Sequence, residues 1–209
     1  MKNLEAIWKF GTAGFRAEMG DGAHQLNKTS VVKIAWAISQ FLKPESRVVI
    51  GYDARHHSRE FTELVAEVLN AQGHQSFIHA EIIPTPIGAF SVTNLKADLG
   101  IMITASHNPP ADNGIKVYGS NGAQIVAPDT HKIEELIIDA PDFEEIKLSE
   151  SEIKLVPESV IDAYFQGLKD VMPAEAGIQH RAPGELDPSR RWDDKITYTP
   201  LHGVGTKYA

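Results

Sequence analysis

The chain has 209 residues, a formal net charge of −8 and no cysteine. This length allows one large domain, or one domain and part of a second. An acidic chain with scattered basic residues argues against nucleic acid as the main partner, and the lack of cysteine excludes disulfides, thiolate zinc sites and a cysteine nucleophile. No signal peptide or membrane-spanning stretch is recognisable. We therefore expect a cytoplasmic protein with no membrane partner.

The first motif is a glycine-rich turn at residues 10–16, FGTAGFR. Its two glycines let the backbone come close to a ligand, and Thr12 adds a hydroxyl. Arg16 carries a planar fork of donors that suits a phosphate or a carboxylate. The motif lacks the Gly-Lys-Ser/Thr ending of a P-loop. Taken alone, a plain turn with a surface arginine remains the simpler interpretation.

Hydrophobic periodicity predicts alternating helices and strands after this turn. The predicted segments are a helix at 29–42 capped by Thr29 or Ser30, a strand at 47–52, a helix between its cap Ser58 and its stop Gly73, a strand at 75–83, a helix at 87–96 and a strand at 99–103. Such alternation indicates a parallel sheet with right-handed crossovers and helices on both faces. A further helix is predicted from about 158 to 171.

The carboxyl ends of parallel strands share one edge of a sheet, where such sheets bind ligands. Four loops can meet there, those near Arg16, Asp53, Thr85 and Ser106.

Between these loops lie further polar residues. We interpret Arg55, which follows Asp53, as half of an ion pair that braces the loop. His56 and His57 are interpreted as loop histidines, because neighbouring residues rarely share a metal and no carboxylate lies at ligand spacing.

The most informative stretch is residues 104–109, TASHNP, which follows the apolar strand at 99–103. Small polar residues at the carboxyl end of a buried strand make Ser106 a candidate nucleophile. The alternative is an ordinary turn, because Ser, Asn and Pro are common turn residues.

Two hairpin signals follow, Asn113-Gly114 and Asn121-Gly122, and they predict an antiparallel excursion. Lys116 lies between them in an apolar strand. A lysine close to a phosphorylated site can act as an acid, a base or a charge clamp, whereas the pattern alone favours a solvent-facing strand residue.

Together these motifs resemble the α-D-phosphohexomutase superfamily. Four segments occur in the order of that family, at residues 11–16, 104–109, 114–118 and 199–205. Residues 51–56 and 120–125 are most similar to its phosphoglucomutase/phosphopentomutase branch.

The resemblance implies a three-layer α/β/α fold with a mixed, mainly parallel sheet. It also implies a division of the chain into the family's first, phosphoserine-bearing domain at 1–171, a linker or insertion at 172–194, and the first strand of a second similar domain at 195–209. Residues 172–194 are rich in proline and glycine and weakly resemble peptides encoded by dispersed bacterial repeats. A translated insertion followed by early termination is our hypothesis for them.

The family's chemistry implies that Ser106 carries a phosphoryl group, which passes to a sugar monophosphate and returns from a bisphosphate. The implied reaction converts glucose 1-phosphate to glucose 6-phosphate, with Mg²⁺ on an oxygen of phospho-Ser106 and glucose 1,6-bisphosphate as activator. Arg16 and His107 would orient the phosphoserine, and Lys116 would handle the proton of the sugar hydroxyl. Further implied roles are a substrate-side donor at Thr12 and support from Asn108, Asp53, Arg55 and His202.

The loops by which the family's other domains hold Mg²⁺, read the sugar and grip its phosphate do not occur in this sequence. We therefore expect an N-terminal fragment that is inactive alone, and that either is a piece of a whole enzyme or works with a separate C-terminal remainder. Phosphomannomutase or phosphopentomutase specificity, and a non-catalytic remnant that binds sugar phosphates, remain alternatives. Serine hydrolysis is disfavoured, because a Gly-x-Ser-x-Gly elbow is missing and His107 is too close in sequence to be a comfortable base.

Overall fold

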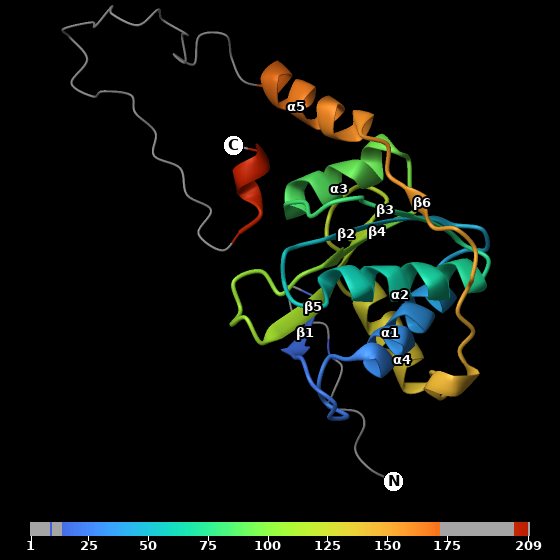
Figure 1. Cartoon of the computed structure of the whole chain (residues 1–209). Helices are drawn as coiled ribbons and strands as arrows, with labels where there is room; N and C mark the ends of the chain where they lie inside the picture. The colour runs from blue at the N-terminus through green and yellow to red at the C-terminus, as the bar shows by residue number, and fades with distance from the viewer. Residues whose placement is uncertain (1–8, 10–13, 172–202, 209) are drawn as a thin grey trace, which may run out of the picture.

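The computed structural model describes residues 9, 14–171 and 203–208 (Figure 1). The strands are β1 (Phe15–Glu18), β2 (Arg47–Tyr52), β3 (Gln75–Ile78), β4 (Leu99–Ile103), β5 (Asp112–Gly119) and β6 (Lys154–Leu155). The helices are α1 (Lys28–Phe41), α2 (Ser58–Ala71), α3 (Thr85–Asn94), α4 (Asp129–Ile138) and α5 (Ser159–Val171), with short 3₁₀ turns η2 (Phe143–Glu145) and η3 (Gly205–Tyr208).

The strands form one sheet in the order β1-β5-β4-β2-β3-β6. β2 pairs in parallel with β3 and β4, and β3 pairs in parallel with β6, whereas β5 is antiparallel to both β4 and β1. The predicted α/β class with a mixed, mainly parallel sheet is confirmed. The antiparallel β5 places residues 104–111, which follow β4, in a direct connection between neighbouring strands.

Helices cover both faces of this sheet (Figure 1). α1, α2 and α4 pack on one face over the larger apolar core, and α3 and α5 pack on the other over a smaller one. Alternate residues of β4 serve the two cores, with Ile101 and Ile103 in the larger and Met102 in the smaller. This period of two explains the unbroken apolar sequence of β4, because both of its faces are buried.

β2 and β4 have the predicted bounds, whereas the predicted helix caps are wrong. α1 is capped by Asn27, whose Oδ1 accepts from the backbone N of Ser30 at 3.1 Å while Ser30 Oγ accepts from the N of Asn27 at 2.9 Å. Ser30 is therefore the return half of a capping box. Ser58 is the first residue of α2 rather than its cap, and its hydroxyl donates instead to Asp53 Oδ1.

The Asn113-Gly114 pair is not a turn, which corrects the first hairpin prediction. Both residues are buried within β5, and the Asn113 side chain donates to His56 O and Ser58 Oγ of the β2–α2 connection. Asn121-Gly122 is a turn, with Gly122 at φ +74° and a hydrogen bond from Gly119 N to Ala123 O. The predicted antiparallel pairing is thus present, with one turn in place of two.

Several predicted features lie outside the described residues. They are Thr12 with its neighbours 10–13, the segment 172–194, the strand at 195–199 and His202. In the part of the chain that the structure describes, no helix is long and apolar enough to cross a membrane.

Candidate active site

Ser106 lies three residues beyond β4, exposed at the carboxyl edge of the sheet. Its φ is +58°, an uncommon conformation for a residue with a Cβ, which costs about 1–3 kcal/mol and persists only where the surroundings enforce it. Its backbone N donates to Thr104 Oγ1 at 2.9 Å, and Asn108 N donates to Ala105 O at 3.1 Å. Residues 104–109 therefore form a tight turn, and this turn also presents the Ser106 hydroxyl to solvent, so the two interpretations of the sequence are compatible.

The imidazole of His107 lies beside this hydroxyl. Its Nδ1 is 3.3 Å from Ser106 Oγ, and both side chains are exposed. A group at this distance can exchange a proton with the serine or contact an anion attached to it.

Arg16 reaches the same loop from β1. Its Nη1 donates to Asn108 Oδ1 at 2.8 Å, and Asn108 Nδ2 donates in turn to Asp112 Oδ2 at 2.9 Å. Nε of Arg16 is buried and has no hydrogen-bond partner in the described part of the chain. A buried donor without an acceptor is costly, so this nitrogen fits a site that receives an anion.

Gly114 makes room for Arg16. The two residues are opposite each other in the β1–β5 ladder, and a Cβ at Gly114 would lie 3.1 Å from Arg16 Cγ. The glycine therefore lets the arginine side chain pass across β5 toward the loop.

Lys116 lies two residues beyond Gly114 on β5, so it shares a sheet face with Arg16. It is partly buried, which corrects the interpretation of a solvent-facing residue. Burial lowers its pKa below the ordinary lysine value, the Arg16 charge lowers it further, and Asp53 acts in the opposite direction. A lysine with a lowered pKa is a better proton carrier near neutral pH than an ordinary one.

Arg55 holds the Ser106 loop from the β2–α2 side. Its Nη1 and Nη2 donate at 2.7–2.8 Å to four carbonyl oxygens, those of Ser106, Asn108, Pro109 and Asp112. Its Nε is 3.5 Å from Asp53 Oδ2, so the predicted ion pair is present. Asp53 Oδ1 also accepts from the backbone N of Arg55 at 3.0 Å.

Asn113 is a residue of this region that sequence analysis missed. Its Nδ2 donates to His56 O at 2.9 Å and to Ser58 Oγ at 3.0 Å, and its Oδ1 accepts from Gly114 N at 2.8 Å. An asparagine just before the apolar residues of the strand was the available signal, but the following glycine made it look like a turn.

We expect Asn113→Ala to lower the free energy of unfolding by about 3 kcal/mol, because it leaves buried partners unsatisfied. Asn121→Ala, which removes one exposed turn contact, is the matched control and should cost less than about 1 kcal/mol. Urea denaturation of both variants measures the difference. Equal decreases in the free energy of unfolding in the two variants would contradict the role given to Asn113.

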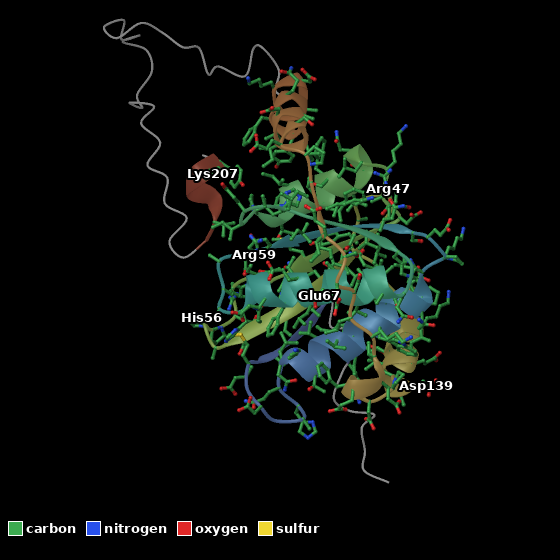
Figure 2. All side chains as sticks on the ribbon, turned by 45° about the vertical axis from the view of Figure 1, so that its right-hand side comes forward. Arg47, His56, Arg59, Glu67, Asp139 and Lys207 are labelled. Atoms are coloured by element: carbon green, nitrogen blue, oxygen red, sulfur yellow. The ribbon has the colours of Figure 1, made fainter. Side chains whose placement is uncertain are left out.

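A pocket of about 590 Å³ lies elsewhere, between the β1–α1 connection and α2. Figure 2 shows Glu67 of this pocket along α2, with His56 and Arg59 near the start of that helix. Its ionisable lining is mainly acidic, namely Asp21, Glu60, Glu63 and Glu67 beside Lys28 and His57. Burial and then the neighbouring Glu63 raise the pKa of Glu67. Because carboxylates repel phosphates, this pocket does not suit a sugar phosphate.

Comparison with known proteins decides the family. Residues 8–143 match the family model described as phosphoglucomutase/phosphomannomutase, alpha/beta/alpha domain I. The chain belongs to this family. The predicted membership of the phosphohexomutase superfamily is confirmed, and the match falls on the part of the chain that contains Ser106.

Among members of the phosphoglucomutase/phosphomannomutase family, the chain is 35% identical over 225 residues to a human phosphopentomutase, covering 99% of this chain and 35% of that protein. It is 35% identical over 212 residues to a phosphoglucomutase of Staphylococcus epidermidis, covering 97% and 36%. The structure of a protein described as a phosphomannomutase from Thermus thermophilus matches with a TM-score of 0.69 and 31% identity, covering 79% and 36%. The chain therefore spans about a third of the length of these relatives.

The described residues do not form a complete site for Mg²⁺, the ion that the family resemblance implies. Among the described residues, no three or more His, Cys, Asp or Glu side chains are grouped so that they could hold a metal ion. His56 and His57 accordingly form no such group. A phosphate oxygen on Ser106 would be one ligand, which is too few for an ion that prefers six oxygens, and we assign no step to it.

Proposed function

We propose that this chain is the phosphoserine-bearing part of a phosphosugar mutase of the phosphoglucomutase type, with Ser106 as the phosphoryl carrier. The observation that carries the proposal is the exposed Ser106 hydroxyl, held in a strained turn at the sheet edge. Arg16, whose Nε has no partner among the described residues, contacts this loop. In this proposal residues 1–171 form the phosphoserine domain, 172–194 a linker or insertion, and 195–209 the start of a second domain. Further domains of the family, on the same chain or on a separate one, would complete the active site.

In the proposed reaction a free hydroxyl of a sugar monophosphate attacks the phosphorus of phospho-Ser106. A new O–P bond forms while the bond to Ser106 Oγ breaks, and the sugar becomes a bisphosphate. Lys116 accepts the proton of the attacking hydroxyl, and Ser106 Oγ leaves with the bonding electrons and takes up a proton from solvent. The reverse transfer of the other phosphoryl group to Ser106 completes the isomerisation.

The protein's task in such a transfer is to position the groups and to neutralise charge. Arg16 suits that task through its Nε, which has no partner in residues 14–171, and His107 through its position beside Ser106 Oγ. We assign Asn108 and Asp53 supporting roles through their hydrogen bonds. For Thr12 and His202 we propose supporting roles from the family resemblance alone.

Glucose 1-phosphate is the substrate we propose, with glucose 1,6-bisphosphate as intermediate and activator. The relatives named phosphoglucomutase and phosphopentomutase support a phosphorylated sugar, and their different names leave pentose phosphates as the second candidate.

Incubation of the purified chain with glucose 1,6-bisphosphate tests the proposal. We expect the mass of one phosphoryl group to be added and peptide mapping to place it on Ser106. Ser106→Ala should abolish the addition, whereas the control Ser120→Ala, at an exposed turn, should retain it. No labelling of the unmodified chain, or labelling that survives in Ser106→Ala, would overturn the role of Ser106.

A further inference from the structure

The guanidinium of Arg55 has all of its donors engaged. Each of its four Nη hydrogens is directed at one backbone carbonyl of the Ser106 loop, at 2.7–2.8 Å. Its fifth donor, Nε, faces the Asp53 carboxylate at 3.5 Å. We infer that Arg55 is a positioning residue for phosphoryl transfer, which holds Ser106 in its left-handed conformation and binds no substrate. The inference rests on the proposed role of Ser106.

An arginine beside a phosphoserine would ordinarily be interpreted as a phosphate ligand. Arg55 has no donor left for that purpose, and the carboxylate against its Nε would repel a phosphate. Arg16 is the opposite case, because its buried Nε has no partner in the described part of the chain. The two arginines therefore divide the work, with Arg16 available to an anion and Arg55 holding the backbone.

The bonds of Arg55 explain how the loop conformation is enforced. Nη2 joins the carbonyls of Ser106 and Asn108, and Nη1 joins those of Pro109 and Asp112, so one rigid plane fixes both ends of the loop. A trans peptide holds its C=O and N–H in opposite directions. Since Ser106 O points at Arg55, the N–H of His107 points away from it. This arrangement can offset the strain of the φ of +58° at Ser106.

A second set of hydrogen bonds, centred on Asp53, holds Arg55 in place. Asp53 Oδ1 accepts from Arg55 N at 3.0 Å and from Ser58 Oγ at 2.8 Å. Ser58 Oγ also accepts from the buried Asn113 at 3.0 Å, which ties the β2–α2 loop to β5. The clamp is thus anchored on two strands of the sheet rather than on the loop that it holds.

Labelling kinetics with glucose 1,6-bisphosphate test this role. In Arg55→Lys, which keeps the charge but has one donor nitrogen in place of three, we expect the maximal rate to fall about 100-fold, as for a small misplacement of reacting groups. The half-saturating bisphosphate concentration should stay within about 2-fold, because no substrate contact is lost. Guanidinium ion should partly restore the rate of Arg55→Ala. Arg59→Lys, an exposed arginine of α2, is the control.

A wild-type rate in Arg55→Lys would overturn the inference. So would a rise in the half-saturating bisphosphate concentration with an unchanged maximal rate, because that change is the mark of a phosphate ligand. Hydrogen exchange of the Ser106 and Asn108 amides, which donate to Thr104 Oγ1 and Ala105 O, gives a second readout that needs no substrate. It should quicken at least about 10-fold in Arg55→Lys and remain unchanged in Arg59→Lys. Unchanged exchange in Arg55→Lys would also overturn the inference.

Failure of the proposed function and failure of the Arg55 inference can be distinguished. If the unmodified chain is not labelled, the proposed function fails, and the exchange measurement alone decides the role of Arg55. If Arg55→Lys does not fold, Asp53→Asn replaces it, since it exchanges the carboxylate oxygen facing Nε for an uncharged amide group and can keep Oδ1 as the acceptor for Arg55 N and Ser58 Oγ. That variant should show a smaller rate loss in the same direction, and a wild-type rate and wild-type exchange there would count against the clamp.

Discussion

Lys116→Arg is expected to slow the labelling of Ser106 by glucose 1,6-bisphosphate by about 100-fold or more, in the range of general acid–base catalysis. In the labelling direction the sugar oxygen leaves and must receive a proton, which the proposal assigns to protonated Lys116. Arginine keeps the positive charge but does not release its proton in proteins. A wild-type rate in Lys116→Arg would therefore show that position 116 acts only as a charge clamp.

The pH dependence gives an independent check of Lys116. The donor is the protonated amine, so the labelling rate should fall as the pH rises through the pKa of Lys116. Burial and the Arg16 charge place that pKa below the ordinary 10.5. The fall should disappear in Lys116→Met. Because burial disfavours the charged amine, we expect Lys116→Met to be no less stable than the exposed control Lys43→Met.

Gly114→Ala is expected to lower the free energy of unfolding by about 3 kcal/mol, the upper part of the range for overpacking. A Cβ there would overlap the carbonyl oxygen of Phe15 and lie 2.9 Å from that of Thr104. Both obstacles are backbone atoms, so β1 or the start of the Ser106 loop must move. Arg16 would be displaced as well, and labelling of Ser106 should slow.

Gly119→Ala on the same strand is the matched control. A Cβ at Gly119 meets nothing closer than 3.4 Å, an ordinary van der Waals distance. Urea denaturation should place Gly119→Ala within about 1 kcal/mol of the unmodified chain. A similar decrease in the free energy of unfolding for both substitutions would mean that β1 adjusts easily to a side chain at position 114.

Local pattern was sufficient where one physical signal dominated. The apolar runs of β2 and β4 gave the correct strand bounds, because both faces of these strands are buried. The stop at Gly73 was correct for a local reason, since its φ of +86° suits glycine alone. The predicted helix caps were wrong because Asn27, Thr29, Ser30 and Ser58 are all acceptable caps by residue type. The hydrogen bond that each side chain makes in the structure decides which one is the cap.

The turn prediction at Asn113-Gly114 failed for a similar reason. Asn-Gly is the strongest short hairpin signal, but here the asparagine satisfies buried groups of the β2–α2 connection, and the glycine accommodates Arg16 from β1. Both needs arise from strands and loops distant in the sequence. A two-residue pattern does not contain them.

The sequence by itself determined the family, the candidate nucleophile Ser106 and the further candidate site residues Arg16, His107 and Lys116, because each belongs to a short contiguous motif. Only the tertiary structure decided how these motifs meet. It placed Arg16 against Asn108, partly buried Lys116 on the Arg16 face, and turned Arg55 from half of an ion pair into a clamp on four carbonyls. The physical reason is that backbone carbonyls carry no residue identity, so a side chain that recognises them leaves no motif in the sequence.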